Sequence, residues 1–158
     1  MNIHEERPGA LLRLLEEAQE QAPHNYLSED TLRSVAAKTG TALSRIYSIV
    51  TFYSFFNLSP QGEHSVVVCR GTACHTRGSR ALLAEAALRL GAENFNIDVD
   101  SSFTTSDALF TVRTVACFGQ CALAPVVAVD GVIHSRMSVG KLAALLKRIA
   151  KASKGGKK

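Results

Sequence analysis

Two close pairs of cysteines constrain this chain more than any other feature of its sequence. They are Cys69-Arg-Gly-Thr-Ala-Cys74 and Cys117-Phe-Gly-Gln-Cys121, and the chain has no other cysteine. Each pair follows an apolar, β-branched run, over 64–69 or 109–115, that predicts a strand. If these strands are parallel neighbours, their carboxyl ends meet at one edge of a sheet and bring all four thiols together. We therefore expect a site for an inorganic centre.

The spacing of the pairs, C-x4-C and then C-x3-C, narrows the choice of centre. Disulfides are disfavoured because the charged opening residues 1–7 lead into no apolar run, so we expect no signal peptide and a reducing compartment. Structural zinc is an alternative, although it favours C-x2-C. Redox-active dithiols use C-x-x-C, which is absent. Plant-type ferredoxins begin with C-x4-C but continue with C-x2-C, so the spacing favours [2Fe–2S] without indicating that class.

At these residues the chain resembles a known family. The segment Val68-Cys69-Arg70-Gly71-Thr72-Ala73-Cys74-His75-Thr76-Arg77-Gly78 is similar to the first cluster loop of the thioredoxin-like [2Fe–2S] ferredoxins. Their second loop resembles Cys117-Phe118-Gly119-Gln120-Cys121-Ala122-Leu123-Ala124-Pro125. The resemblance covers residues 20–150, because Leu43 to Phe56 is also similar to the helical extension of the family. It implies one [2Fe–2S] cluster, with Cys69, Cys74, Cys117 and Cys121 as its ligands.

Members of this family are small subunits that lie beside the FMN subunit of respiratory complex I. Relatives serve NAD(P)-linked [FeFe]-hydrogenases, including electron-bifurcating ones, and NAD-dependent formate dehydrogenases. The resemblance implies a non-catalytic electron-transfer subunit of a cytoplasmic NAD(P)-dependent oxidoreductase. Its expected partners are an FMN- and NAD(H)-binding iron–sulfur subunit and a further catalytic subunit.

The sequence Gly-Thr-Ala-Cys-His at 71–75 is most similar to the hydrogenase members of the family, so an electron-bifurcating hydrogenase is the first candidate for the parent complex. Formate dehydrogenase and complex I are the alternatives. A more remote alternative, from a different functional class, is a zinc-stapled adaptor, meaning a binding module that is held together by structural zinc and recruits partners through its helical extension. A free-standing ferredoxin would resemble the second domain alone, and the helical extension argues against it.

Length and charge limit the domain organisation and the partners. At 158 residues and 46% apolar composition, one domain with a modest extension is the default. We expect a helical extension over 1–60, a thioredoxin-like [2Fe–2S] domain over 61–150 and a basic flexible tail over 151–158. No apolar run approaches the roughly 18–20 residues that span a bilayer, so we expect no membrane insertion. The net charge of +4 comes largely from C-terminal cations without interleaved aromatics, which disfavours nucleic-acid binding.

Three amphipathic helices are predicted in the extension. The first covers 8–21, the second begins after Ser28 as N-cap and ends at Gly40, and the third begins at 41 or 42. The third helix leads into an aromatic segment that holds half of the ten Phe and Tyr residues: Tyr47, Phe52, Tyr53, Phe55 and Phe56. One helix face cannot bury all of these rings, so we expect some of them to contact the second domain or a partner subunit.

The second domain mixes strands and helices. Helices are expected over 77–90 and 138–150, and a short strand over 95–99. Asp130-Gly131 between two apolar runs predicts a hairpin of 126–129 and 132–134. Helices on both faces of a small mixed sheet are compatible with an α/β, thioredoxin-like layout. The family resemblance, rather than this pattern, selects that fold.

The remaining residues suit an electron carrier rather than a catalyst. A four-thiolate cluster is anionic, and burying it requires amide donors and cations. The sequence offers amides around Gly71, Thr72, Ala73 and Gly119, and cations at Arg70, His75, Arg77 and Arg113. The four cysteines complete the ligand set without His75. The other histidines, His64 included, are expected at the surface or in turns. Because no dinucleotide fingerprint or P-loop is present, we predict that the isolated chain does not oxidise NAD(P)H.

Overall fold

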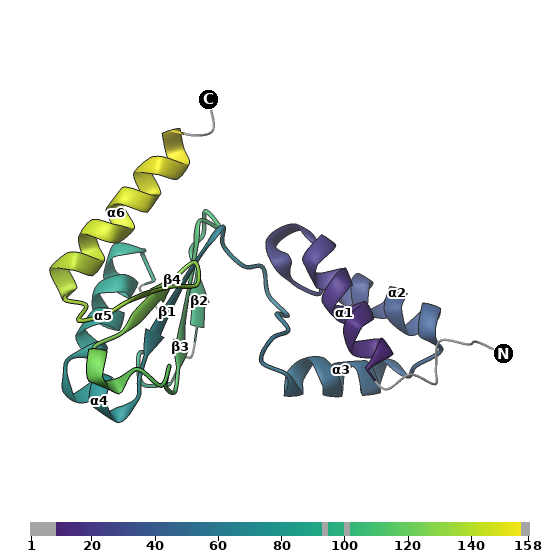
Figure 1. Cartoon of the computed structure of the whole chain (residues 1–158). Coiled ribbons are helices and arrows are strands. Elements are labelled where there is room, and N and C mark those ends of the chain that lie inside the picture. The colour runs from purple at the N-terminus through teal and green to yellow at the C-terminus, as the bar shows by residue number, and fades with distance from the viewer. Residues whose placement is uncertain (1–8, 93–94, 100–101, 156–158) are drawn as a thin grey trace. The chain divides into compact units, whose positions relative to one another are not determined.

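The computed structural model describes residues 9–92, 95–99 and 102–155 of the chain (Figure 1). The chain divides into two compact units, Met1–Gln61 and Gly62–Lys158. This division falls one residue after the predicted boundary, and each unit is described by itself below. Within the described residues, no helix has both the length and the apolar character needed to cross a bilayer.

The first unit is helical, as predicted. Its elements are α1 (Ala10–Gln21), a 3-10 turn (Pro23–Asn25), α2 (Glu29–Thr39) and α3 (Leu43–Phe52). The Ser28 hydroxyl accepts a hydrogen bond from the Thr31 amide at 3.2 Å, and Gly40 ends α2 with φ 68°, so both predicted caps are confirmed. The apolar stripes of the helices meet in one core, formed by Leu15, Leu27, Leu32, Val35, Ile46, Val50 and Phe56. Residue 8, the expected start of α1, lies outside the described residues.

A buried glutamine holds the chain that follows α3. Gln19 is 1% exposed, and its side-chain amide donates to the Phe55 carbonyl at 3.2 Å and accepts from the Asn57 amide at 2.7 Å. The Leu27 amide in turn donates to the Asn57 carbonyl at 2.8 Å. The aromatic segment after α3 is therefore tied at two points to the helical core. Sequence analysis did not single out Gln19, although it lies four residues after Leu15 on the buried stripe of α1.

The second unit is built on a five-stranded sheet of order β2-β3-β1-β4-β5. Its strands are β1 (His64–Cys69), β2 (Ser102–Thr104), β3 (Phe110–Val115), β4 (Val127–Val129) and β5 (Val132–His134). The central strands β1 and β3 are parallel neighbours, which is the condition under which the two cysteine pairs were expected to meet, and the other strand pairs are antiparallel. Asp130 and Gly131 both have positive φ, 49° and 80°, which confirms the predicted hairpin turn.

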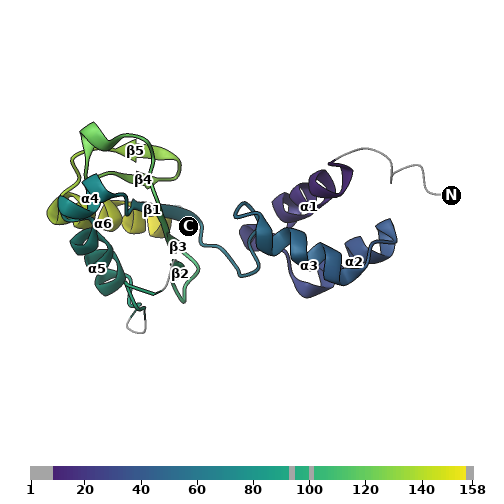
Figure 2. The same ribbon diagram turned by 90° about the horizontal axis from the view of Figure 1, so that it is seen from below.

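The long helices of this unit, α5 (Ser79–Arg89) and α6 (Val139–Gly155), cover the same face of the sheet (Figures 1 and 2). Their side chains share one core with alternate residues of β1, β3 and β4. The prediction of helices on both faces was therefore wrong. The physical reason is the alternation of the strands: Val66, Val68 and Val112 face the helices, whereas Ser65 and Arg113 point to the opposite side.

Three local predictions needed correction. The first cysteine loop contains a short helix, α4 (Thr72–Thr76), that the pattern did not predict. Residues 95–99 form no strand, and β2 pairs with β3 a few residues later instead. Helix α6 continues to Gly155, so residues 151–155 of the tail that was expected to be flexible are helical. The rest of that tail, 156–158, lies outside the described residues.

His64 was expected at the surface or in a turn, but it is half-buried at the start of β1. Its ring nitrogens lie 2.8 Å from Asp130 Oδ2 and 2.9 Å from Ser153 Oγ. Asp130 also accepts a hydrogen bond from the Ser65 amide at 2.8 Å. This network joins β1, the β4–β5 turn and the C-terminal half of α6, and the residues involved are too far apart in sequence for a local pattern to reveal it.

Candidate metal centre

The parallel pairing of β1 and β3 brings the two cysteine loops to one edge of the sheet. Cys69 is the last residue of β1 and pairs with Val115, the last residue of β3. The Arg70 amide then donates to the Val115 carbonyl at 2.8 Å, and the Cys69 amide donates to the Val126 carbonyl at 3.2 Å. Both loops therefore leave the sheet side by side, which confirms the predicted convergence of the strand ends.

The thiols form pairs at this edge. Cys117 Sγ and Cys121 Sγ lie 3.7 Å apart, while the Cys69 thiol contacts those of Cys74 and Cys117. Two sulfurs bound tetrahedrally to one metal at about 2.3 Å lie about 3.8 Å apart, so the Cys117–Cys121 pair already has the separation of two ligands on one metal atom. Among the described residues, no three His, Cys, Asp or Glu side chains are gathered around a single metal position.

Burial distinguishes the two pairs. Cys69 and Cys74 are each 2% exposed, within a small apolar cluster that includes Ala124 and Val126. Cys117 and Cys121 are exposed. A group held by all four sulfurs would thus have one half inside the unit and the other half at its surface.

Backbone amides stabilise negative charge at the buried end of the site. Burial acts to raise the pKa of Cys69, but hydrogen bonds from the amides of Gly71 and Phe118, together with the thiols of Cys74 and Cys117, leave that pKa lowered. Burial, and then the Cys69 thiol, raise the pKa of Cys74. The neighbouring Cys117 thiol raises the pKa of Cys121. Of these three thiols, only that of Cys69 has its anionic form favoured by the surrounding protein, and a bound cation would favour the thiolate form of all of them.

Two glycines shape the loops around the sulfurs. A Cβ at Gly71 would lie 2.9 Å from the Ala116 carbonyl oxygen and 3.5 Å from Cys117 Sγ, so a side chain there would push the loops apart. Gly119 has φ 78° and donates its amide to Cys117 Sγ at 3.2 Å. Four thiols, amide donors aimed at sulfur and a close approach of backbone fit an iron–sulfur cluster. Sequence analysis had named the Gly71 and Gly119 amides but missed that of Phe118, for which the sequence offers no special signal.

Two of the predicted cations, Arg70 and Arg77, have structural roles near the site. Arg70 Nη1 donates to the Ile97 carbonyl at 2.7 Å, and its other nitrogen lies 3.9 Å from Asp98. Arg77 Nη1 reaches the Ala124 carbonyl at 3.4 Å and so links the two loops. His75, which was not expected to be a ligand, has an exposed side chain on α4.

Comparison with known proteins identifies the family. The family model for thioredoxin-like [2Fe–2S] ferredoxin matches residues 1–150. The chain belongs to this family. The match confirms the predicted family, and with it the α/β fold and the [2Fe–2S] cofactor expected of that family. The matched residues include the helical first unit.

Two relatives belong to different enzymes. The HndA protein of the NADP-reducing hydrogenase of Solidesulfovibrio fructosivorans is 31% identical, covering 89% of this chain and 77% of that protein. A component of the NADH-quinone oxidoreductase of Rhizobium meliloti is 32% identical, covering 94% of this chain and 83% of that protein.

A solved structure shares the fold of this ferredoxin. The air-oxidised NAD+-reducing [NiFe]-hydrogenase has a TM-score of 0.70 at 21% identity, over 96% of this chain. The ferredoxin spans only 24% of that longer hydrogenase chain.

Proposed function

We propose that this ferredoxin holds one [2Fe–2S] cluster on Cys69, Cys74, Cys117 and Cys121 and relays single electrons within a cytoplasmic NAD(P)-dependent oxidoreductase complex. Its partner in the relay is a flavin- and NAD(H)-binding iron–sulfur subunit. The family membership supports the cofactor, and the names of the relatives support the class of complex.

The observation that carries this proposal is the unequal exposure of the two thiol pairs on one sheet edge. The buried pair, Cys69 and Cys74, anchors the site in the fold, whereas Cys117 and Cys121 present it at the surface. Electron transfer between proteins requires a short path, and an exposed pair of ligands provides one. The exposed pair is therefore the side through which electrons enter and leave.

In this proposal the chain binds the cluster and stabilises its charge, and it does not itself act on a substrate. The cluster, when bound, accepts and releases one electron at a time. The amides of Gly71, Phe118 and Gly119 direct their hydrogen bonds at sulfur and so lower the cost of its negative charge. The sequence carries no dinucleotide fingerprint, so hydride chemistry is left to the flavin partner.

The parent complex is proposed from two kinds of support. The Gly-Thr-Ala-Cys-His segment at 71–75 favours a hydrogenase, most specifically an electron-bifurcating one. The identities to the hydrogenase protein and to the quinone oxidoreductase component, 31% and 32%, do not separate the two complexes. The equivalent subunit of complex I or of a formate dehydrogenase is the second candidate.

Metal analysis of the anaerobically purified chain tests the cofactor. We expect iron and acid-labile sulfide in equal amounts, about two of each per chain, and a rhombic signal in electron paramagnetic resonance only after reduction. One zinc ion per chain without sulfide would instead establish the zinc-stapled adaptor. Flavin-free protein should show no NAD(P)H:dye reductase activity, and measurable activity would contradict the assignment as a carrier.

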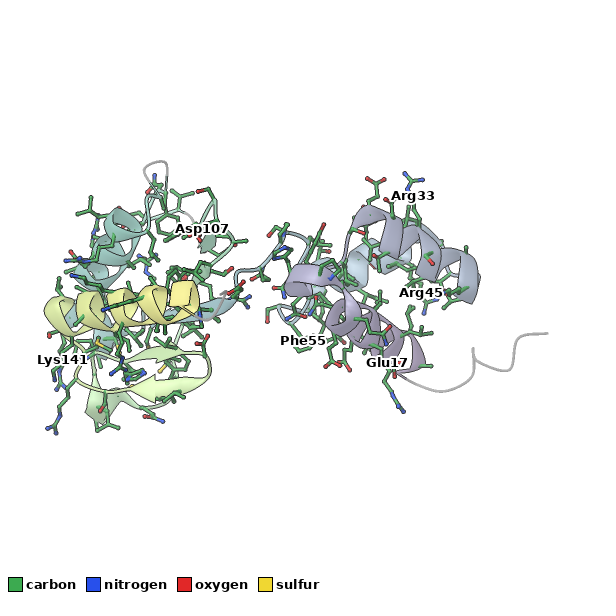
Figure 3. All side chains as sticks on the ribbon, turned by 90° about the horizontal axis from the view of Figure 1, so that it is seen from above. Glu17, Arg33, Arg45, Phe55, Asp107 and Lys141 are labelled. Carbon is green, nitrogen blue, oxygen red and sulfur yellow. The ribbon has the colours of Figure 1, made fainter. Side chains whose placement is uncertain are left out.

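An aromatic surface on the first unit supports a docking role. Phe52, Tyr53 and Phe55 are 78%, 45% and 54% exposed, and Figure 3 labels Phe55 in this unit. Phe56 is buried in the core and Tyr47 is half-buried against it, so three of the five rings stay exposed, as expected if one helix face cannot bury them all. Burying one such ring contributes about 1.5–3 kcal/mol. We therefore assign this surface to the contact with the flavin-bearing subunit.

Co-purification of the complex tests this assignment. We expect the double change Phe52→Ser and Phe55→Ser to weaken assembly at least tenfold, because two rings lose their burial. Leu88→Ser is the matched control, since Leu88 is 79% exposed on the second unit. Equal assembly of the double variant and wild type would show that the rings serve another purpose.

A further inference from the structure

The C-terminal part of the chain has a charge distribution that electron transfer does not require. Residues 131–158 contain eight Lys or Arg and no Asp or Glu, whereas residues 1–130 contain ten Lys or Arg and fourteen Asp or Glu. The net charge of +4 is therefore the sum of −4 on residues 1–130 and +8 on residues 131–158. Such a separation of charge favours an oppositely charged partner on the basic side.

Part of this basic segment lines a groove between the β4–β5 hairpin and α6. The groove has a volume of about 580 Å³. Its helix side is formed by Lys141, Ala144, Leu145 and Arg148, which recur at the spacing of one helical face. The opposite face of α6, with Leu142 and Leu146, is buried in the core. Helix α6 thus has a second, partly apolar face, on which Leu145 is half-buried and Lys141, Ala144 and Arg148 are exposed.

The floor of the groove is apolar, and its far wall carries Ile133 together with the polar residues His134 and Ser135. Met137 is buried at its base, and Ile133 of β5 is 40% exposed beside it. Val132, the neighbouring residue of β5, is 61% exposed. Because consecutive strand residues point to opposite faces, Ile133 enters the groove and Val132 does not. Ile133 and Leu145 therefore form an apolar contact area flanked by charge, which is typical of a protein-binding surface.

The cations of the groove are available to a partner. None of the ion pairs in the part of the chain that the structure describes involves Lys141 or Arg148. Figure 3 shows Lys141 on α6, and Arg148 follows seven residues later on the same face. At 1.5 Å per residue, the two positions lie about 10 Å apart along the helix axis.

We propose that this groove binds an acidic amphipathic helix of a partner protein. Two carboxylates seven residues apart would pair with Lys141 and Arg148, and apolar side chains between them would pack on Leu145 and Ile133. The charge complementarity selects an acidic partner. The groove lining contains no Phe, Tyr or Trp on which bases could stack in succession, which disfavours nucleic acid, and a concave surface does not suit a flat membrane. This surface is separate from the cysteine site, so the proposal does not rest on the electron-transfer assignment.

A synthetic helix tests the pairing on the full-length protein. The probe is a fluorescent, covalently stapled peptide with Glu at i and i+7 and Leu at i+3 and i+4, and anisotropy measures its affinity. The double reversal K141E/R148E should weaken binding about tenfold or more, because it turns two attractions into repulsions. K147E/K151E changes the net charge equally on exposed residues of α6 outside the groove lining and should weaken binding less than about threefold.

A photoreactive benzophenone side chain at position 144 tests the natural partner in cells. We expect a crosslink to a helix with paired acidic residues. Equal weakening by both double variants, a crosslink to a segment without acidic pairs, or no crosslink at all would overturn the proposal. It would also fail if duplex DNA or phosphatidylglycerol vesicles bound the protein and the acidic helix did not.

Discussion

The clearest test of the cysteine site is the addition of one methyl group at Gly71. This residue has φ −57° and ψ 154°, a conformation that alanine adopts without strain. In the absence of any clash, alanine would stabilise the protein by about 0.4–1 kcal/mol, because it lowers the conformational entropy of the unfolded chain. Any loss seen in Gly71→Ala must therefore come from the space around the new methyl group.

The structure indicates how large that loss should be. The added Cβ would lie 2.9 Å from the Ala116 carbonyl oxygen and 3.4 Å from Cys117 Cβ. Restoring an ordinary contact requires the two cysteine loops to separate by a few tenths of an ångström, and overpacking of this kind costs about 1–3 kcal/mol. Metal–ligand distances tolerate only about 0.2 Å, so the cluster should be lost more readily than the fold.

Gly140→Ala is the matched control. Gly140 lies on α6, and apart from its chain neighbours and the adjacent helix backbone nothing lies within 4 Å of its Cβ position, so Gly140→Ala should stabilise the protein by about 0.5–1 kcal/mol. The assay is iron and sulfide content after anaerobic purification, together with urea unfolding of both variants. A Gly71→Ala protein with the iron content and unfolding midpoint of wild type would refute the argument that backbone contact positions the loops.

Three other changes test separate features. Cys121→Ser should abolish or severely reduce cluster retention, measured by visible absorbance, and an unchanged spectrum would exclude this ligand. Gln19→Ala should lower the free energy of unfolding by about 1–3 kcal/mol, because two backbone groups lose their partner, whereas exposed Glu20→Ala should change it by less than about 0.5 kcal/mol. Gly62→Ala should destabilise the second unit by at least about 1 kcal/mol, since its Cβ would lie 2.5 Å from the Phe110 backbone; an unfolding midpoint equal to wild type would contradict this.

Much of the local structure follows from short-range chemistry that the sequence displays. Ser28 caps α2 because its hydroxyl reaches an amide three residues ahead, and Asp130-Gly131 turns the hairpin because both residues tolerate positive φ. These interactions involve only residues close together in the sequence, so they can be predicted without knowing the tertiary structure. The unpredicted α4 and the misplaced strand at 95–99 lie where apolar periodicity is short and equally compatible with helix, strand or loop.

The sequence by itself determined which residues carry the thiols and where they lie: four cysteines, in two loops that each follow a strand. Only the tertiary structure decided that Cys69 and Cys74 are buried while Cys117 and Cys121 are exposed. It also decided that Gly71 contacts Ala116 and that Gln19 holds the aromatic segment. These features depend on which distant segments pack against each residue, and packing is set by the whole fold rather than by neighbours in the chain.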